Sequence, residues 1–86
     1  SGEPCWLLFT VYKNVGNLYL KCKDIEAAEE FFNRAYAINS EDLNLLLSYG
    51  YLHLHANRLD LAKDRFAEII ERDRDYTEAY IGLSLV

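Results

Sequence analysis

Two histidines and two cysteines are the residues of this sequence whose types could support metal or nucleophilic chemistry. His53 and His55 are two positions apart, whereas a zinc-binding pair on a helix needs a four-residue spacing. Cys5 and Cys22 lack the Cys-x-x-Cys spacing of a metal-binding or redox pair, and no histidine accompanies them. We therefore expect no catalytic residue, no metal ligand, no cofactor and no enzymatic activity.

Charge and composition narrow the classes of partner. The 86 residues carry 9 basic and 14 acidic side chains, a net charge of −5, and 51% of the residues are hydrophobic. A protein that binds a phosphate backbone needs a basic face, so we expect no nucleic-acid partner. The sequence has no run of 18 apolar residues, so we expect no membrane-spanning segment, no membrane partner and a cytoplasmic location.

The elements that position these residues follow from an internal repeat with a 34-residue period. A shift by 34 residues brings five identities into register: Gly16/Gly50, Leu18/Leu52, Leu20/Leu54, Ala28/Ala62 and Phe32/Phe66. A third unit begins near Thr77. We predict a single domain over residues 1–86, with repeats at about 9–42 and 43–76 and a partial repeat at 77–86.

Hydrophobic spacing within each repeat is helical. Apolar residues recur at three- and four-residue steps, which predicts five helices: about 6–21, 25–38, 41–56, 59–72 and from 77 onward. Asp24 and Ser40 are the expected N-caps of the second and third helices. The third helix is apolar almost all round, which is typical of a helix covered on several sides. The predicted fold is all-α.

The residues at fixed places in each unit resemble the tetratricopeptide repeat (TPR) family. The motif residues are Val15-Gly16, Tyr19, Ala28 and Phe32 in the first unit and Tyr49-Gly50, His53, Ala62 and Phe66 in the second. The resemblance implies a right-handed α-solenoid of antiparallel helix pairs. In this arrangement we expect the glycines and alanines to let paired helices approach closely. His53 stands where the motif has a core aromatic residue, so we expect it to pack in the core.

The resemblance also implies a function and a site. In this family the first helix of each repeat lines a concave groove that binds a peptide, which predicts a non-enzymatic protein–protein interaction module. We expect Lys13 and Asn17 to receive polar or acidic groups of a partner, and Leu47 and Tyr51 to anchor apolar side chains. The predicted peptide-binding groove comprises Lys13, Asn17, Asn44, Leu47, Tyr51 and His55.

Other interpretations of the same residues stay open at this stage. Lys13 and Asn17 match the opening pair of the carboxylate clamp of TPR co-chaperones, but Glu78 reverses a charge that the clamp needs. Tyr80 and Leu85 belong to a third unit without its second helix, which favours a scaffold segment of a longer array or self-association through this end. The apolar groove residues could then pack against a neighbour.

Trp6 precedes the first repeat, and we expect it to cover the open end of the helix stack, with stacking on a ligand as the alternative.

Overall fold

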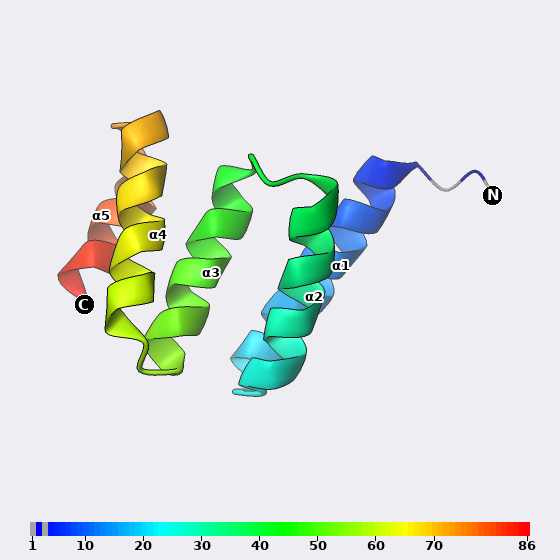
Figure 1. The fold of residues 1–86 in the computed structure, drawn as a ribbon, viewed down its shortest axis with the longest axis horizontal. Coiled ribbons are helices and arrows are strands. Elements are labelled where there is room, and N and C mark those ends of the chain that lie inside the picture. Colours follow the sequence, from blue (N-terminus) through cyan, green and yellow to red (C-terminus); the bar gives the residue numbers. More distant parts are fainter. Residues whose placement is uncertain (1, 3) are drawn as a thin grey trace. The chain divides into compact units, whose positions relative to one another are not determined.

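A computed structural model describes Gly2 and residues 4–86, and these residues form five α-helices in the predicted order (Figure 1). The helices are α1 (Cys5–Lys21), α2 (Ile25–Ile38), α3 (Leu43–His55), α4 (Leu59–Arg72) and α5 (Thr77–Ser84). Ser1 and Glu3, which the predicted domain includes, lie outside the described residues. The chain divides into two compact units, Ser1–Leu45 and Leu46–Val86. None of the five helices is both long and apolar enough to cross a membrane.

The helix starts show which caps the sequence predicts correctly. The Asp24 side chain accepts a hydrogen bond from the Ala27 backbone N–H at 3.3 Å, which confirms it as the N-cap of α2. The prediction of Ser40 as the cap of the third helix is wrong, because α3 begins at Leu43. Asp42, immediately before this helix, accepts from the Leu45 N–H at 2.9 Å.

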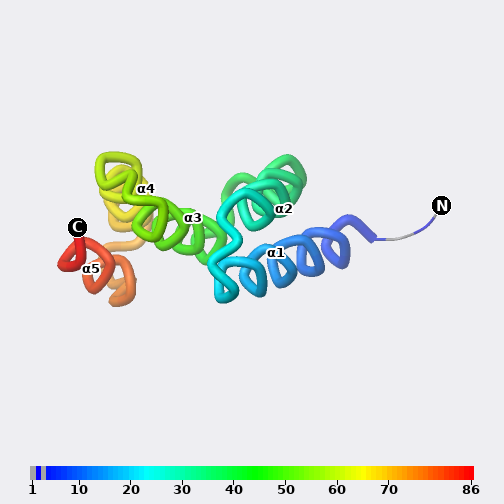
Figure 2. The backbone as a smooth tube through the Cα atoms, turned by 90° about the horizontal axis from the view of Figure 1, so that it is seen from below, coloured from blue at the N-terminus to red at the C-terminus, as the bar shows by residue number. Residues whose placement is uncertain are grey.

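Close packing of α1 on α2 holds the first unit together, and Figure 2 shows the two helices side by side. A Cβ atom added at Gly16 would lie 2.5 Å from Cδ1 of Phe32, so only glycine allows the ring to seat there. Phe32 and Ala28 are fully buried. The expected close approach of the paired helices at Gly16 is confirmed for the first helix pair.

Phe66 is the centre of the second unit. A Cβ atom at Gly50 of α3 would lie 2.6 Å from its Cζ, and one at Gly82 of α5 would lie 2.5 Å from the same atom. The ring of Tyr51 meets it edge-on, with 5.4 Å between ring centroids. Phe66 and Ala62 are fully buried. One aromatic ring therefore joins three helices.

The turns that close the two helix pairs repeat each other. Lys23 and Asn57, one period apart, have φ angles of 65° and 60°, in the left-handed region. In the first turn, Asp24 N–H donates to the Tyr19 carbonyl at 3.0 Å, and in the second Arg58 N–H donates to the His53 carbonyl at 2.8 Å. This bonding is that of a Schellman motif, which satisfies carbonyl groups at the helix end.

Candidate functional site

The predicted site residues lie on equivalent stripes of α1 and α3, the first helices of the two full repeats. Their spacing of three or four residues places the members of each stripe on one face of their helix. On α1 the stripe is Thr10, Lys13, Asn17 and Lys21, and on α3 the equivalent positions are Asn44, Leu47, Tyr51 and His55. We call these the α1 stripe and the α3 stripe and describe each on its own helix.

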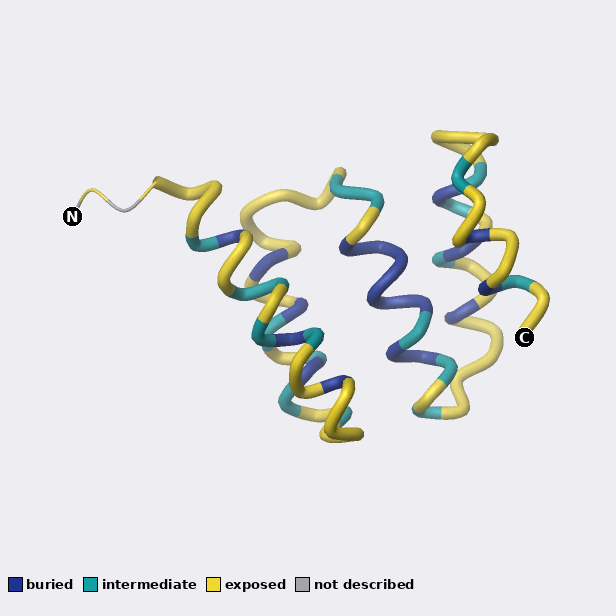
Figure 3. Tube along the Cα trace, turned by 180° about the vertical axis from the view of Figure 1, so that it is seen from behind, coloured by how far each residue is buried: buried dark blue, intermediate teal, exposed yellow. Residues whose placement is uncertain are grey.

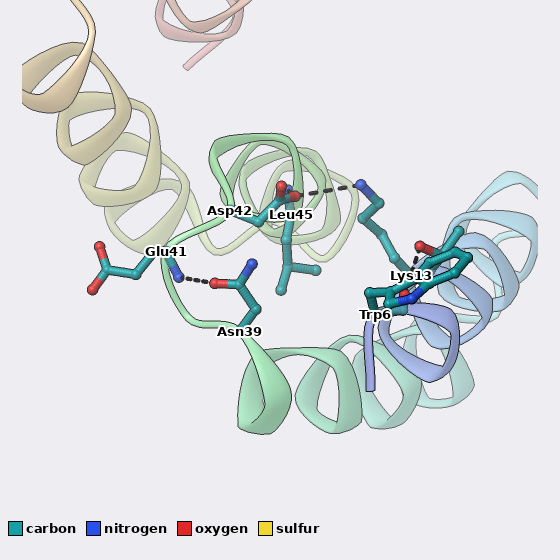
Figure 4. Close-up of polar contacts among 7 residues, drawn as sticks. Trp6, Lys13, Asn39, Glu41, Asp42 and Leu45 are labelled. Atoms are coloured by element: carbon teal, nitrogen blue, oxygen red, sulfur yellow. Dashed lines mark hydrogen bonds and ion pairs between the residues drawn. The ribbon is translucent and has the colours of Figure 1, made fainter. Parts of the chain in front are cut away.

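Lys13 of the α1 stripe is engaged within the first unit. Its Nζ lies 3.3 Å from Oδ2 of Asp42, and both side chains are largely buried. The same ammonium group lies 5.3 Å from the ring centroid of Phe9. Figure 4 shows the Lys13 side chain extended from α1 toward Asp42. A partner carboxylate that approaches Lys13 must therefore compete with a carboxylate already in place.

Asp42 links this ion pair to the start of α3. Its Oδ2 accepts both from Lys13 and from the Leu45 backbone N–H. The turn before it is fixed as well, because Asn39 Oδ1 accepts from the Glu41 N–H at 2.9 Å (Figure 4). Lys13 thus bridges α1 to the helix cap 29 residues later, a contact that spacing alone does not predict.

The remaining polar members of the predicted site differ in exposure. Asn17 is half-buried on α1, whereas Asn44 is exposed in the first turn of α3. Asn44 can therefore offer its amide to a partner as both donor and acceptor.

Trp6 occupies a place that the sequence analysis did not foresee. Its side chain is 69% exposed, so the expectation that it covers the end of the helix stack is wrong. It lies four residues before Thr10, whose hydroxyl donates to the Trp6 carbonyl at 2.9 Å. Figure 4 shows the indole beside Lys13 on the same side of α1. Trp6 therefore extends the α1 stripe by one turn.

The α3 stripe has an apolar middle between two exposed polar ends. Tyr51 is half-buried because its ring packs against Phe66. Leu47 is only 9% exposed and offers little surface to a ligand. His55, in the last turn, is exposed. The accessible part of this stripe is thus Asn44, one side of Tyr51, and His55.

His53 points elsewhere, as the two-residue spacing from His55 predicts. It is buried and stacks on Tyr49 of the same helix, with 6.2 Å between centroids and 24° between planes. The Arg65 guanidinium of α4 lies 5.0 Å from the Tyr49 ring. The expected packing role of His53 is confirmed. Within the part of the chain that the structure describes, no three His, Cys, Asp or Glu side chains come together as a metal site.

Comparison with known proteins supports the repeat architecture. A family model described as "Tetratricopeptide repeat" matches residues 17–84. A curated relative, the Sol locus transcriptional repressor of Clostridium acetobutylicum, is 27% identical over 77 residues. The match covers 90% of this chain but 24% of that relative, so the chain spans about a quarter of its length. No solved structure matches this chain.

Proposed function

Because this chain belongs to the tetratricopeptide repeat family, we propose that it is a protein–protein interaction module that binds a peptide or partner segment along the first helices of its repeats. The observation that supports this most directly is the α3 stripe, where a partly accessible tyrosine lies between exposed Asn44 and His55. Such a surface combines an apolar anchor with polar groups that fix orientation, as peptide-binding faces do.

Each proposed contact has a chemical role. Tyr51 would pack against an apolar side chain of the partner. Leu47, one turn earlier in α3, would add a smaller apolar contact. Asn44 and His55 would hydrogen-bond to the peptide backbone or to polar side chains. Because Tyr51 is held by Phe66, little side-chain entropy is lost when a ligand arrives, which favours affinity.

On α1, Asn17 and Lys13 would receive polar or acidic groups. The affinity of Lys13 for a carboxylate is limited by Asp42, whose charge already compensates it at 3.3 Å. An acidic ligand must displace this partner or share the ammonium group with it. We therefore expect α1 to tune specificity and the α3 stripe to supply most of the binding free energy.

The relative from Clostridium is named a transcriptional repressor, and that name describes the whole protein. Because the present chain has a net charge of −5, a role in such a process would run through contact with another protein rather than with DNA.

A peptide array of acidic, basic and apolar sequences, probed with labelled protein, tests the proposal. The test variant is Asn44→Ala/His55→Ala, because both side chains are exposed and their removal leaves the core intact. Substitution of Leu47 or Tyr51 is avoided, since both contribute to packing. We expect the variant to lose the peptides that the wild type selects, at about 1 kcal/mol for each lost hydrogen bond.

A matched control removes an exposed asparagine of α2 and an exposed lysine of α4, in the variant Asn33→Ala/Lys63→Ala. Circular dichroism establishes that all three proteins are folded. Retention of the selected peptides by the control, together with their loss in the test variant, supports the α3 stripe. Equal binding by both variants would contradict it, as would the absence of any selected peptide.

A further inference from the structure

Lys13 lies in the middle of the α1 stripe, and a carboxylate of the same unit compensates its charge. The side chains of Lys13 and Asp42 are only 18% and 29% exposed, and 3.3 Å separates Nζ of the first from Oδ2 of the second. The ammonium group also lies near the ring of Phe9, which is buried. Because a partly buried ion pair is screened less than an exposed one, salt weakens this attraction little. A carboxylate that arrives from solution therefore meets a cation that already has its counter-ion.

Asp42 is held in position by contacts that do not involve Lys13. Its Oδ2 accepts from the N–H of Leu45, a fully buried residue at the start of α3, at 2.9 Å. The turn before α3 is exposed, as Figure 3 shows, and Asn39 Oδ1 accepts there from the Glu41 N–H. The Asp42 carboxylate is thus oriented before it pairs with the ammonium group. A ligand carboxylate, in contrast, must lose translational and rotational freedom to take the same place.

The repeat itself does not require this ion pair. The positions 34 residues after Lys13 and Asp42 are occupied by Leu47 and Tyr76, which are both uncharged. Tyr76 immediately precedes α5 and caps it with no side-chain hydrogen bond, yet α5 forms. A helix can therefore start at this point of the repeat without a capping carboxylate. The ion pair is a feature of one place on the proposed binding face rather than of the fold.

We propose that Asp42 determines the specificity of the α1 stripe by excluding acidic ligands. It occupies on Lys13 the place that a ligand carboxylate would take, and its negative charge repels an incoming anion. The segment of a partner that lies along α1 is therefore uncharged and contacts this face through hydrogen bonds and apolar side chains. This role of Asp42 rests on the proposed function, because it selects among peptides on the same face.

The variant Asp42→Asn tests this role by a gain of binding. Asparagine still caps α3 but no longer neutralises Lys13, whose flexible stem lets the ammonium group reach a ligand. The probes are two labelled peptides of equal length: a leucine–glutamate peptide with a free terminal carboxylate, and its amidated leucine–glutamine counterpart. In fluorescence anisotropy, we expect the acidic peptide to bind Asp42→Asn about fivefold or more tighter than the wild type. The uncharged peptide should bind both proteins equally.

Two controls separate a local effect at Lys13 from a general change in net charge. Asp24→Asn removes the same charge from the cap of α2, where Asp24 accepts from the Ala27 N–H at 3.3 Å, and should leave both affinities unchanged. The double variant Lys13→Gln/Asp42→Asn should lose the gain for the acidic peptide. Circular dichroism establishes that each variant is folded. If Asp42→Asn does not fold, Asp42→Ser replaces it, because serine also caps a helix without a charge.

Unchanged binding of the acidic peptide by folded Asp42→Asn overturns the proposal, whether or not the uncharged peptide binds. So does an equal gain for the two peptides, or the same gain in Asp24→Asn. A gain that persists in the double variant also overturns it, since the acidic peptide would then bind another cation such as Lys21. Failure of the wild type to select any peptide on the array counts instead against the proposed function, so the two failures are distinguishable.

Discussion

Helices α1 and α3 are the same element of successive repeats, yet they differ in the polarity of one face and in the exposure of another. The proposed ligand-contacting stripe is polar and cationic on α1 and apolar in the middle on α3. The other face is apolar on both helices, but Val11 and Leu18 of α1 are exposed while Leu45 and Leu52 of α3 are fully buried. Both helices contain a glycine, Gly16 or Gly50, against which a phenylalanine of the next helix packs. The repeat motif therefore fixes contacts within a helix pair and leaves the outward faces open to specialise.

Replacement of Phe32 or Phe66, the two rings that pack against the motif glycines, should have the largest effect on stability. The size of the loss should also differ between the two units. We expect Phe66→Ala to lower the free energy of unfolding by about 3–5 kcal/mol, since a fully buried ring is lost. Phe32→Ala should cost the same or less, because its ring meets Gly16 whereas Phe66 meets both Gly50 and Gly82. Urea denaturation followed by circular dichroism measures both. A cost for Phe66→Ala below that for Phe32→Ala would break the comparison.

A methyl group at either motif glycine should cost less than loss of the ring. Gly16→Ala and Gly50→Ala each place a Cβ against an aromatic ring, at about 1–3 kcal/mol for overpacking. The higher helix propensity of alanine offsets about 1 kcal/mol of this. Both variants should therefore be less stable than the wild type in thermal unfolding. If Gly16→Ala were stabilising, the ring of Phe32 would have to move without strain.

Lys13 and Asp42, which form the ion pair between α1 and the cap of α3, should contribute unequally to the free energy of unfolding. Asp42→Ala removes the cap and the ion pair together, with an expected loss of about 1–2 kcal/mol. Lys13→Ala leaves the cap in place and removes the ion pair together with the contact to the Phe9 ring, at about 0.2–1 kcal/mol for the ion pair. Asp42→Asn is the control, because asparagine still caps the helix but carries no charge. In urea titrations it should behave like Lys13→Ala, and a loss as large as that of Asp42→Ala would mean that the charge itself dominates.

The smallest expected effects are at the two equivalent turns. Lys23→Gly relieves a lysine held at a φ of 65°, and we expect a gain in stability of about 0.5–1 kcal/mol. Asn57→Gly should gain less, since asparagine tolerates the left-handed region better than lysine. Differential scanning calorimetry resolves the two melting temperatures. A larger gain at Asn57 would show that side-chain contacts, rather than backbone conformation, set the stability of these turns.

Local signals in the sequence predicted most of the fold. The 34-residue shift identified the glycines, alanines and phenylalanines that pack within each helix pair, because the same close approach recurs in each repeat. Asp24 was predictable as a cap because it immediately precedes an apolar helical period. Ser40 was not the cap of α3, because the helix begins at Leu43 and the Asp42 carboxylate immediately before it accepts from the Leu45 N–H.

The candidate site was less predictable, because its properties depend on residues distant in the sequence. Spacing placed Lys13 on the same face of α1 as Asn17. Its ion pair with Asp42, however, joins residues 29 positions apart. The low exposure of Leu47 and the high exposure of Trp6 likewise depend on what packs nearby rather than on residue type. Periodicity predicts which residues share a helix face, whereas tertiary packing determines whether that face is accessible.

The ring of Phe66 also has a consequence for how the second unit opens. Because the same side chain fits against Gly50 of α3 and Gly82 of α5, neither helix can separate from α4 without exposing it to water. The amide protons at these crossings should then exchange with deuterium together, at a rate set by one shared opening reaction rather than by fraying of single helices. Helix α5 has eight residues and is too short to be stable alone in water. Its protection from exchange would therefore depend on the Phe66 ring of α4.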